Sequence, residues 1–248
     1  MTFELPSDVK LILSMLEEKG YRADIVGGCV RDHILGAVPS DYDITTSARP
    51  EQIKEVFSNM RVLDIGIKHG TITVILNDVP YEITTYRTES EYLDHRHPSR
   101  VDFADKLSDD LGRRDFTMNA IAYNINDGIT DIFYGRKDIE AKVVRAVGNP
   151  RERFFEDALR ILRAVRFSSV LGFTIEEETS RALFYYEGDD IAELLEAVVE
   201  HYGSKLADDT CIKVEVVMTF EPVKYDKFIK NISVPPYSPF IMPIKPFK

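Results

Sequence analysis

Two aspartates separated by one residue, Asp41 and Asp43, are the side chains of this 248-residue chain best placed to do chemistry. An apolar run that ends in Gly27 and Gly28 precedes them, with Arg31 just after it. Residues two apart on a strand point to the same face, so both carboxylates can converge on one position. Mg²⁺ prefers such oxygen ligands, and the glycines let backbone N–H groups approach a phosphate closely. The sequence therefore predicts a nucleoside triphosphate site with Asp41 and Asp43 as its metal ligands.

Several short elements must position these groups. The apolar strand that ends at the glycines is followed by a short helix with Arg31, whose N-terminal dipole favours an anion, and by a second strand with both aspartates. Residues 71–76 and 81–87 alternate as strands do and are joined by an Asn77-Asp78 turn, so we expect a hairpin. Glu82 then lies on the polar face of a strand in the same sheet. It is either a third catalytic carboxylate or an ordinary surface glutamate.

Two adjacent arginines, Arg113 and Arg114, precede a mostly apolar run over residues 115–122. The planar guanidinium fork suits phosphate and ribose oxygens, so Arg114 together with Asp115 is a candidate for holding the sugar and phosphates of a nucleotide. A helix end with solvated arginines explains the same pattern without a ligand.

A helix is predicted over residues 151–167, where Phe155, Leu159 and Leu162 recur at the spacing of one buried face. Asp157 and Arg160 are three residues apart and therefore neighbours on such a helix. A surface salt bridge is the simplest interpretation of this pair. Recognition of a polar ligand by the same two side chains is the alternative.

These segments, in this order, resemble class II tRNA nucleotidyltransferases and bacterial poly(A) polymerases of the DNA polymerase beta-like superfamily, over roughly residues 5–183. The motifs are G-G-x-V-R-D followed by D-x-D, then R-R-D-F-T-x-N-A, and then E-D-x-x-R. The resemblance implies that Asp157 and Arg160 read the incoming base, accepting C and A and rejecting U and G. It assigns nucleotide binding to Gly27, Gly28, Arg31, Arg114, Asp115, Asn119, Asp157, Arg160 and Arg163, and catalysis to Asp41 and Asp43. Glu82 is added from its strand position as the candidate third catalytic carboxylate.

Composition is compatible with an RNA-binding enzyme but does not identify one. The net charge is −11, yet residues 136–166 hold nine Lys or Arg against five Asp or Glu, so RNA should meet this part of the chain. The two cysteines and five histidines form no zinc or redox motif. No apolar run approaches the length of a membrane span, and no signal peptide is recognised. We therefore expect a cytoplasmic protein without a membrane partner.

The predicted fold is α/β, with a nucleotidyltransferase head built on a small mixed sheet over residues 1–140. A helical neck for nucleobase recognition follows over residues 141–187. Residues 188–248 form an atypical C-terminal segment of unknown role, which begins with an acidic helix and ends with five prolines in its last 15 residues. A homodimer formed through the acidic part is one way in which RNA binding would be strengthened.

The function predicted from the resemblance is template-independent transfer of CMP and AMP from CTP and ATP to an RNA 3′ end. CCA addition to tRNA, by two-metal in-line attack with Mg²⁺, is the leading case. Poly(A) synthesis is the alternative within the same enzyme class. A catalytically idle RNA-binding protein is the alternative from another class.

Overall fold

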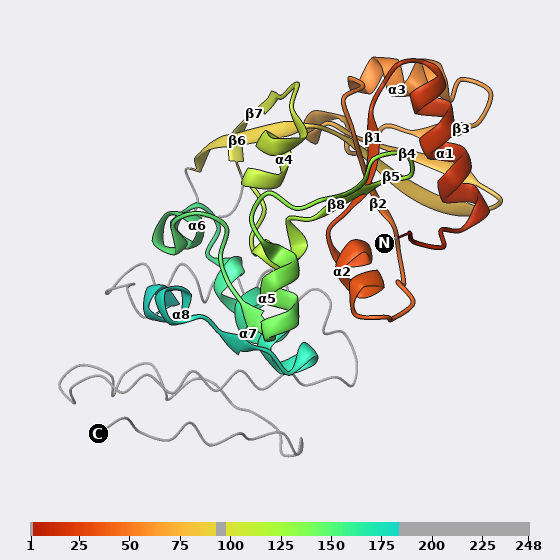
Figure 1. Cartoon of the computed structure of the whole chain (residues 1–248). Coiled ribbons are helices and arrows are strands. Elements are labelled where there is room, and N and C mark those ends of the chain that lie inside the picture. The colour runs from red at the N-terminus through yellow and green to blue at the C-terminus, as the bar shows by residue number, and fades with distance from the viewer. Residues whose placement is uncertain (1, 93–97, 184–248) are drawn as a thin grey trace, which may run out of the picture. The chain divides into compact units, whose positions relative to one another are not determined.

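The structure, a computed structural model, describes residues 2–92 and 98–183 (Figure 1). The predicted acidic helix and the proline-rich end lie outside these ranges. The strands described are β1 Ala23–Val26, β2 Asp43–Thr46, β3 Arg61–Leu63, β4 Thr71–Leu76, β5 Val79–Thr85, β6 Arg87–Tyr92, β7 Pro98–Phe103, β8 Ala122–Asn124, β9 Gly128–Thr130, β10 Val143–Val144 and β11 Thr174–Ile175.

The helices are α1 Ser7–Glu18, α2 Gly28–Ile34, α3 Pro50–Val56, α4 Leu107–Gly112, α5 Gly135–Ala141, α6 Pro150–Glu156, α7 Leu159–Leu171 and α8 Glu177–Leu183, with 3₁₀ turns η1 Ile67–His69 and η2 Thr117–Asn119. Among the described residues, no helix is both long and apolar enough to cross a bilayer.

A seven-stranded mixed sheet in the order β3-β4-β5-β2-β1-β8-β9 is the frame of the N-terminal part. Strands β2 and β5 pair in parallel, and the other neighbours in this sheet pair antiparallel. This confirms the predicted α/β class and its mixed sheet. The predicted hairpin is also confirmed as β4 and β5, with Asn77 and Asp78 both at positive φ in the turn. Such a turn matches the twist of the flanking strands.

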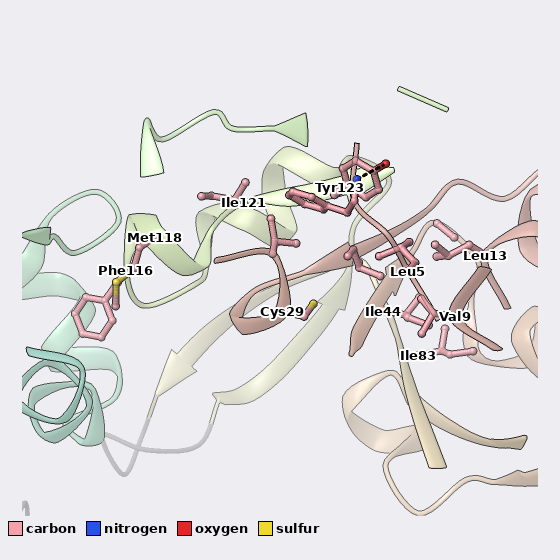
Figure 2. Close-up of a cluster of buried hydrophobic side chains, with 14 of the residues drawn as sticks. Leu5, Val9, Leu13, Cys29, Ile44, Ile83, Phe116, Met118, Ile121 and Tyr123 are labelled. Carbon is pink, nitrogen blue, oxygen red and sulfur yellow. Dashed lines mark hydrogen bonds between the residues drawn. The ribbon is translucent and has the colours of Figure 1, made fainter. Parts of the chain in front are cut away.

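The core is continuous from α1 to α7. The apolar face of α1, made of Val9, Ile12, Leu13 and Leu16, is fully buried. Figure 2 shows Val9 and Leu13 near Ile44 and Ile83 of the sheet, and Phe116 and Met118 at the other end of the same cluster. Phe116 packs edge-on against Phe167 of α7, with ring centroids 5.8 Å apart. The sheet and the helices that follow it therefore share one apolar interior.

The prediction of a single helix over residues 151–167 was wrong. It is divided into α6 and α7, because Asp157 has an extended backbone with φ −141° and ψ 102°. The Asp157 carboxylate accepts a hydrogen bond of 3.0 Å from the backbone N–H of Leu159. A short acidic side chain that bonds a nearby backbone N–H competes with continued helix, and this contact begins α7.

The buried face of these helices also differs from the expected one. Phe155 is 57% exposed, and Leu159 and Leu162 are only partly buried. The core instead takes a face that includes two alanines: Phe154, Ala158, Ile161, Ala164 and Phe167. The expectation failed because it weighted large apolar residues, whereas α7 uses small residues for close packing.

Candidate functional site

A glycine turn is the centre of the candidate site. Strand β1 ends at Val26, and α2 begins at Gly28 after Gly27, which has φ +82° and ψ −132°. A Cβ atom placed on Gly27 would lie 3.2 Å from Nη1 of Arg114 and 3.8 Å from Oδ2 of Asp43. Only glycine combines this backbone conformation with such close neighbours. The turn therefore brings main chain, a carboxylate and a guanidinium group together.

The acidic residues converge beside this turn. The parallel pairing of Ile44 with Ile83 places Asp43 next to Glu82 on the same face of the sheet. Burial raises the pKa of Asp43 above its usual range; the charge of Arg114 lowers it, and the charges of Asp41 and Glu82 raise it further. Asp41 is exposed and lies before β2 rather than within it, so the expectation that one strand carries both aspartates was wrong. Its Oδ1 accepts a bond of 3.1 Å from Ser40 Oγ.

The donor set suits a hard divalent cation that is shared with a substrate. Within residues 2–92 and 98–183, no group of three or more His, Cys, Asp or Glu side chains forms a complete metal cage. Two carboxylates completed by phosphate oxygens and water are the arrangement that Mg²⁺ commonly takes in phosphoryl-transfer sites. A bound cation would offset both the burial of Asp43 and the charges of Asp41 and Glu82, which together raise its pKa.

Arg114 is held from behind by α4. Its Nη2 donates to Oδ2 of Asp110 over 3.2 Å, while Nη1 lies toward Gly27. Its Nε is buried and has no hydrogen-bond partner among the described residues. Burying an N–H group without a partner is costly, and a phosphate or ribose oxygen is a suitable partner.

A chain of hydrogen bonds connects the glycine turn to α7. Arg31 Nη1 donates to Oδ1 of Asn119 over 2.9 Å, and Asn119 Nδ2 donates to Oδ1 of Asp115 over 3.4 Å. Arg163 Nε donates to Oδ2 of Asp115 over 2.7 Å. Burial raises the pKa of Asp115, but the charge of Arg163 and several hydrogen bonds outweigh it, so the pKa lies below its usual value. The guanidinium groups of Arg31 and Arg163 both lie over the ring of Phe167.

The predicted partners Asp157 and Arg160 are adjacent but do not form a simple salt bridge. Arg160 Nε lies 3.9 Å from Asp157 Oδ2, whereas its Nη1 donates to Glu156 Oε2 over 2.8 Å. Arg160 Nη2 donates to the carbonyl oxygen of Arg113 over 3.2 Å. Burial raises the pKa of Asp157, with Arg160 lowering it in part. Arg160 is therefore the more buried of the two side chains, and it already makes hydrogen bonds to Glu156 and to the backbone of Arg113.

Two acidic residues of the site were missed from the sequence. Asp110 bonds Arg113 and Arg114, and Glu156 bonds Arg153 and Arg160. Each of these acidic residues is three positions from one arginine and four positions from another. Residues at these two spacings are neighbours on a helix surface. That spacing was the available signal. It was overlooked because a surface ion pair produces the same pattern.

Comparison with known proteins identifies the family. Residues 23–145 match the Poly A polymerase head domain. The chain is similar to the CCA-adding enzyme of Lactobacillus helveticus, with 51% identity over 172 residues that cover 69% of this chain and 43% of the relative. The CCA-adding enzyme of Staphylococcus epidermidis is 41% identical over 235 residues, 94% of this chain and 58% of the relative. This second match extends beyond residue 183, where the resemblance had been expected to end.

Solved structures agree. The Bacillus stearothermophilus CCA-adding enzyme in complex with CTP is similar with a TM-score of 0.64 and 42% identity, over 72% of this chain and 43% of that one. The Thermotoga maritima CCA-adding enzyme complexed with tRNA has a TM-score of 0.60 and 26% identity, over 79% and 44%. The chain thus spans about half the length of the relatives that it matches. Residues 23–145 of this chain therefore belong to the Poly A polymerase head domain family, the family to which these similarities to CCA-adding enzymes point.

Proposed function

We propose that the chain transfers nucleotides without a template to an RNA 3′ end, and specifically that it adds CMP and AMP from CTP and ATP to tRNA. The observation that carries this proposal is that the side chains of Asp43 and Arg114 both lie against the backbone of Gly27, in the turn between β1 and α2. Its relatives are named as CCA-adding enzymes, which favours CCA addition over poly(A) synthesis. The cytoplasm is the proposed location, and a homodimer remains part of the proposal.

Asp41 and Asp43 are the proposed ligands of Mg²⁺, and Glu82 is the proposed third catalytic carboxylate. Bound Mg²⁺ would lower the pKa of the RNA 3′-hydroxyl and neutralise charge on the leaving pyrophosphate. The hydroxyl oxygen attacks the α-phosphorus in line, a new P–O bond forms, and the bond to pyrophosphate breaks. Burial and the charges of Asp41 and Glu82 all raise the pKa of Asp43, so a cation bound at this position would stabilise its carboxylate.

Arg114 is proposed to bind the triphosphate through Nη1 and Nε. Gly27 and Gly28 present the adjacent main chain, and Arg31 with Asn119 keeps that turn in place through their 2.9 Å hydrogen bond. Asp115 is proposed to contact the ribose while it holds Arg163 of α7. Oδ1 of Asp115 already accepts from the backbone N–H of Phe116 and from Asn119, and Oδ2 accepts from Arg163, so a ribose hydroxyl would take the place of one of these donors.

Base selection is proposed to depend on Asp157 and Arg160. Three of the five N–H groups of Arg160 donate to Arg153 O, Glu156 and Arg113 O, which leaves Nε and one Nη2 hydrogen for a ligand. The Asp157 side chain is 24% exposed against 7% for Arg160. Asp157 is therefore the more accessible of the two proposed base-recognition residues. Its carboxylate would accept a hydrogen bond from the exocyclic amine of C or A.

In this proposal residues 1–140 form the catalytic head and residues 141–187 form the neck that recognises the base. Residues 188–248 lie outside this assignment of roles. The basic residues over 136–166 make the neck the proposed surface for the tRNA 3′ end.

The deciding experiment is a filter assay of the full chain with radiolabelled ATP or CTP on tRNA that lacks its 3′ CCA. Incorporation of two CMP and one AMP per tRNA is expected. Incorporation of AMP in long runs would instead identify a poly(A) polymerase. No incorporation at all, with a relative from the family active in the same tubes, would refute both enzyme functions.

A further inference from the structure

A buried carboxylate behind the site, Asp110, has no assigned role. Its side chain is completely buried at the end of α4, yet it carries a full set of donors. Arg113 donates to Oδ1 from Nε over 3.1 Å and from Nη2 over 3.0 Å. Arg114 donates to Oδ2 over 3.2 Å, and Thr45 Oγ1 lies 3.3 Å from the same oxygen. One carboxylate thus holds two consecutive arginines and a strand of the sheet.

This arrangement determines where Arg114 points. The guanidinium group is planar and rigid, so fixing Nη2 on Asp110 also fixes the direction of Nη1. That direction is toward Gly27 and Asp43, where Nη1 lies 3.2 Å from the position a Gly27 Cβ would take. Thr45 belongs to β2, the strand that begins with Asp43. Through Asp110, Arg114 is therefore held in a fixed position relative to β2, the strand that begins with Asp43.

Asp110 also makes it possible for two guanidinium groups to lie side by side. Arg113 and Arg114 are 16% and 18% exposed, so solvent screens their repulsion poorly. Burial raises the pKa of Asp110, but the two arginines outweigh it, and the pKa lies below its usual value. The carboxylate is therefore charged at neutral pH and neutralises one of the two positive charges.

We propose that Asp110 is a positioning residue for nucleotide binding, which holds Arg114 so that Nη1 and Nε meet the triphosphate of the substrate. This inference rests on the proposed function, since it names the residue through which Arg114 acts. Asp110 itself touches no substrate. A purely structural carboxylate would stabilise α4 without any special connection to Arg114.

A double-mutant cycle of ATP binding separates these two roles. The full chain, D110N, R114Q and D110N/R114Q are titrated with Mg-ATP in an isothermal calorimeter, without RNA. Each single variant should weaken ATP binding about tenfold, the factor of one lost charge-assisted hydrogen bond. The double variant should bind no more weakly than R114Q alone, because Asp110 acts only through Arg114.

A matched control is available in Asp24 of β1, a second fully buried carboxylate. It accepts hydrogen bonds from Arg22 and from the hydroxyl of Tyr86, and within the described part of the chain it forms no ion pair with Arg114. D24N should leave the ATP Kd within about twofold of wild type in the folded fraction. An equal loss of ATP affinity in D24N and D110N would assign both effects to general destabilisation and overturn the inference.

T45V provides a second route if D110N does not fold. It removes the hydroxyl on Oδ2 of Asp110 while conserving shape, and it should weaken ATP binding in the wild-type background but not in R114Q. If wild type binds ATP but the loss of affinity in a double variant equals the product of the losses in its two single variants, the positioning role of Asp110 is overturned. The proposed function would not be affected by that result. Failure of wild type to bind Mg-ATP would overturn the proposed function and this inference together.

Discussion

Replacing Gly27 with alanine tests whether the turn between β1 and α2 is the centre of the site. Its φ of +82° and ψ of −132° lie in a region populated almost only by glycine. An L-residue held there costs about 1–3 kcal/mol. For a chain of this size that corresponds to a fall in Tm of about 3–9 °C. This part of the prediction follows from backbone conformation alone.

The second part concerns Arg114. The new Cβ would lie 3.2 Å from Arg114 Nη1, which is closer than ordinary van der Waals contact, so the guanidinium group must shift. A charge-assisted hydrogen bond to the substrate is worth about 1.5–3 kcal/mol. Its loss should lower kcat/KM for CTP and ATP about 10- to 100-fold, mainly through KM. The assay is steady-state nucleotide incorporation on tRNA lacking CCA, with Tm measured by circular dichroism.

Gly20 is the matched control. Its φ is +85°, and a Cβ placed on it meets nothing within 4 Å. Gly20→Ala should therefore lower Tm by a similar amount while leaving kcat/KM unchanged at a temperature where the variant is folded. Equal kcat/KM in the two variants would refute the reasoning, because it would show that the neighbours of Gly27 do not bind the nucleotide.

Three further outcomes are expected. Asp43→Asn should abolish incorporation without lowering the unfolding free energy, since the raised pKa of Asp43 shows that its charge is disfavoured in the fold; a loss of stability in urea titrations would contradict this. The pKa of Asp115 is lowered in the fold, so its pairing with Arg163 stabilises above the unfolded pKa and is lost as pH falls through the folded value. The Tm difference between wild type and Asp115→Asn should thus shrink below about pH 4. Asp157→Ala should lower the ratio of kcat/KM for CTP over UTP, and an unchanged ratio would remove Asp157 from base selection.

The strand, turn and hairpin positions could be predicted because each has a local cause. Gly27-Gly28 after an apolar run, and Asn77-Asp78 between two alternating runs, are residues that tolerate the positive φ angles of tight turns, so they mark turns wherever they separate such runs. The parallel pairing of β2 with β5 is nonlocal, and it alone puts Asp43 beside Glu82. Sequence spacing placed Glu82 on a polar face, but it did not identify its neighbour on the next strand.

The region around Asp157 shows where such reasoning fails. Periodicity favoured one continuous helix, yet one hydrogen bond that the backbone N–H of Leu159 donates to the Asp157 carboxylate ends that pattern. The choice of buried face followed the break, with Phe154 inside and Phe155 outside. Hydrophobic size could not decide this, because two phenylalanines stand next to each other. Hydrophobic periodicity contains no information on a side chain that competes with the helix for a backbone N–H, which is why it missed the break.

The bonds of Arg31, Asn119, Asp115 and Arg163 have a consequence for how the site works as a unit. They run through buried or partly buried side chains from the glycine turn of the head to the middle of α7. Phe167 closes the same path from the apolar side, under the guanidinium groups of Arg31 and Arg163. A displacement of α7 must therefore either break the Asp115–Arg163 pair or move Asn119 and the turn with it. Since breaking the pair would leave the buried carboxylate of Asp115 without its arginine, the proposed base-reading and phosphate-binding groups should move together rather than independently.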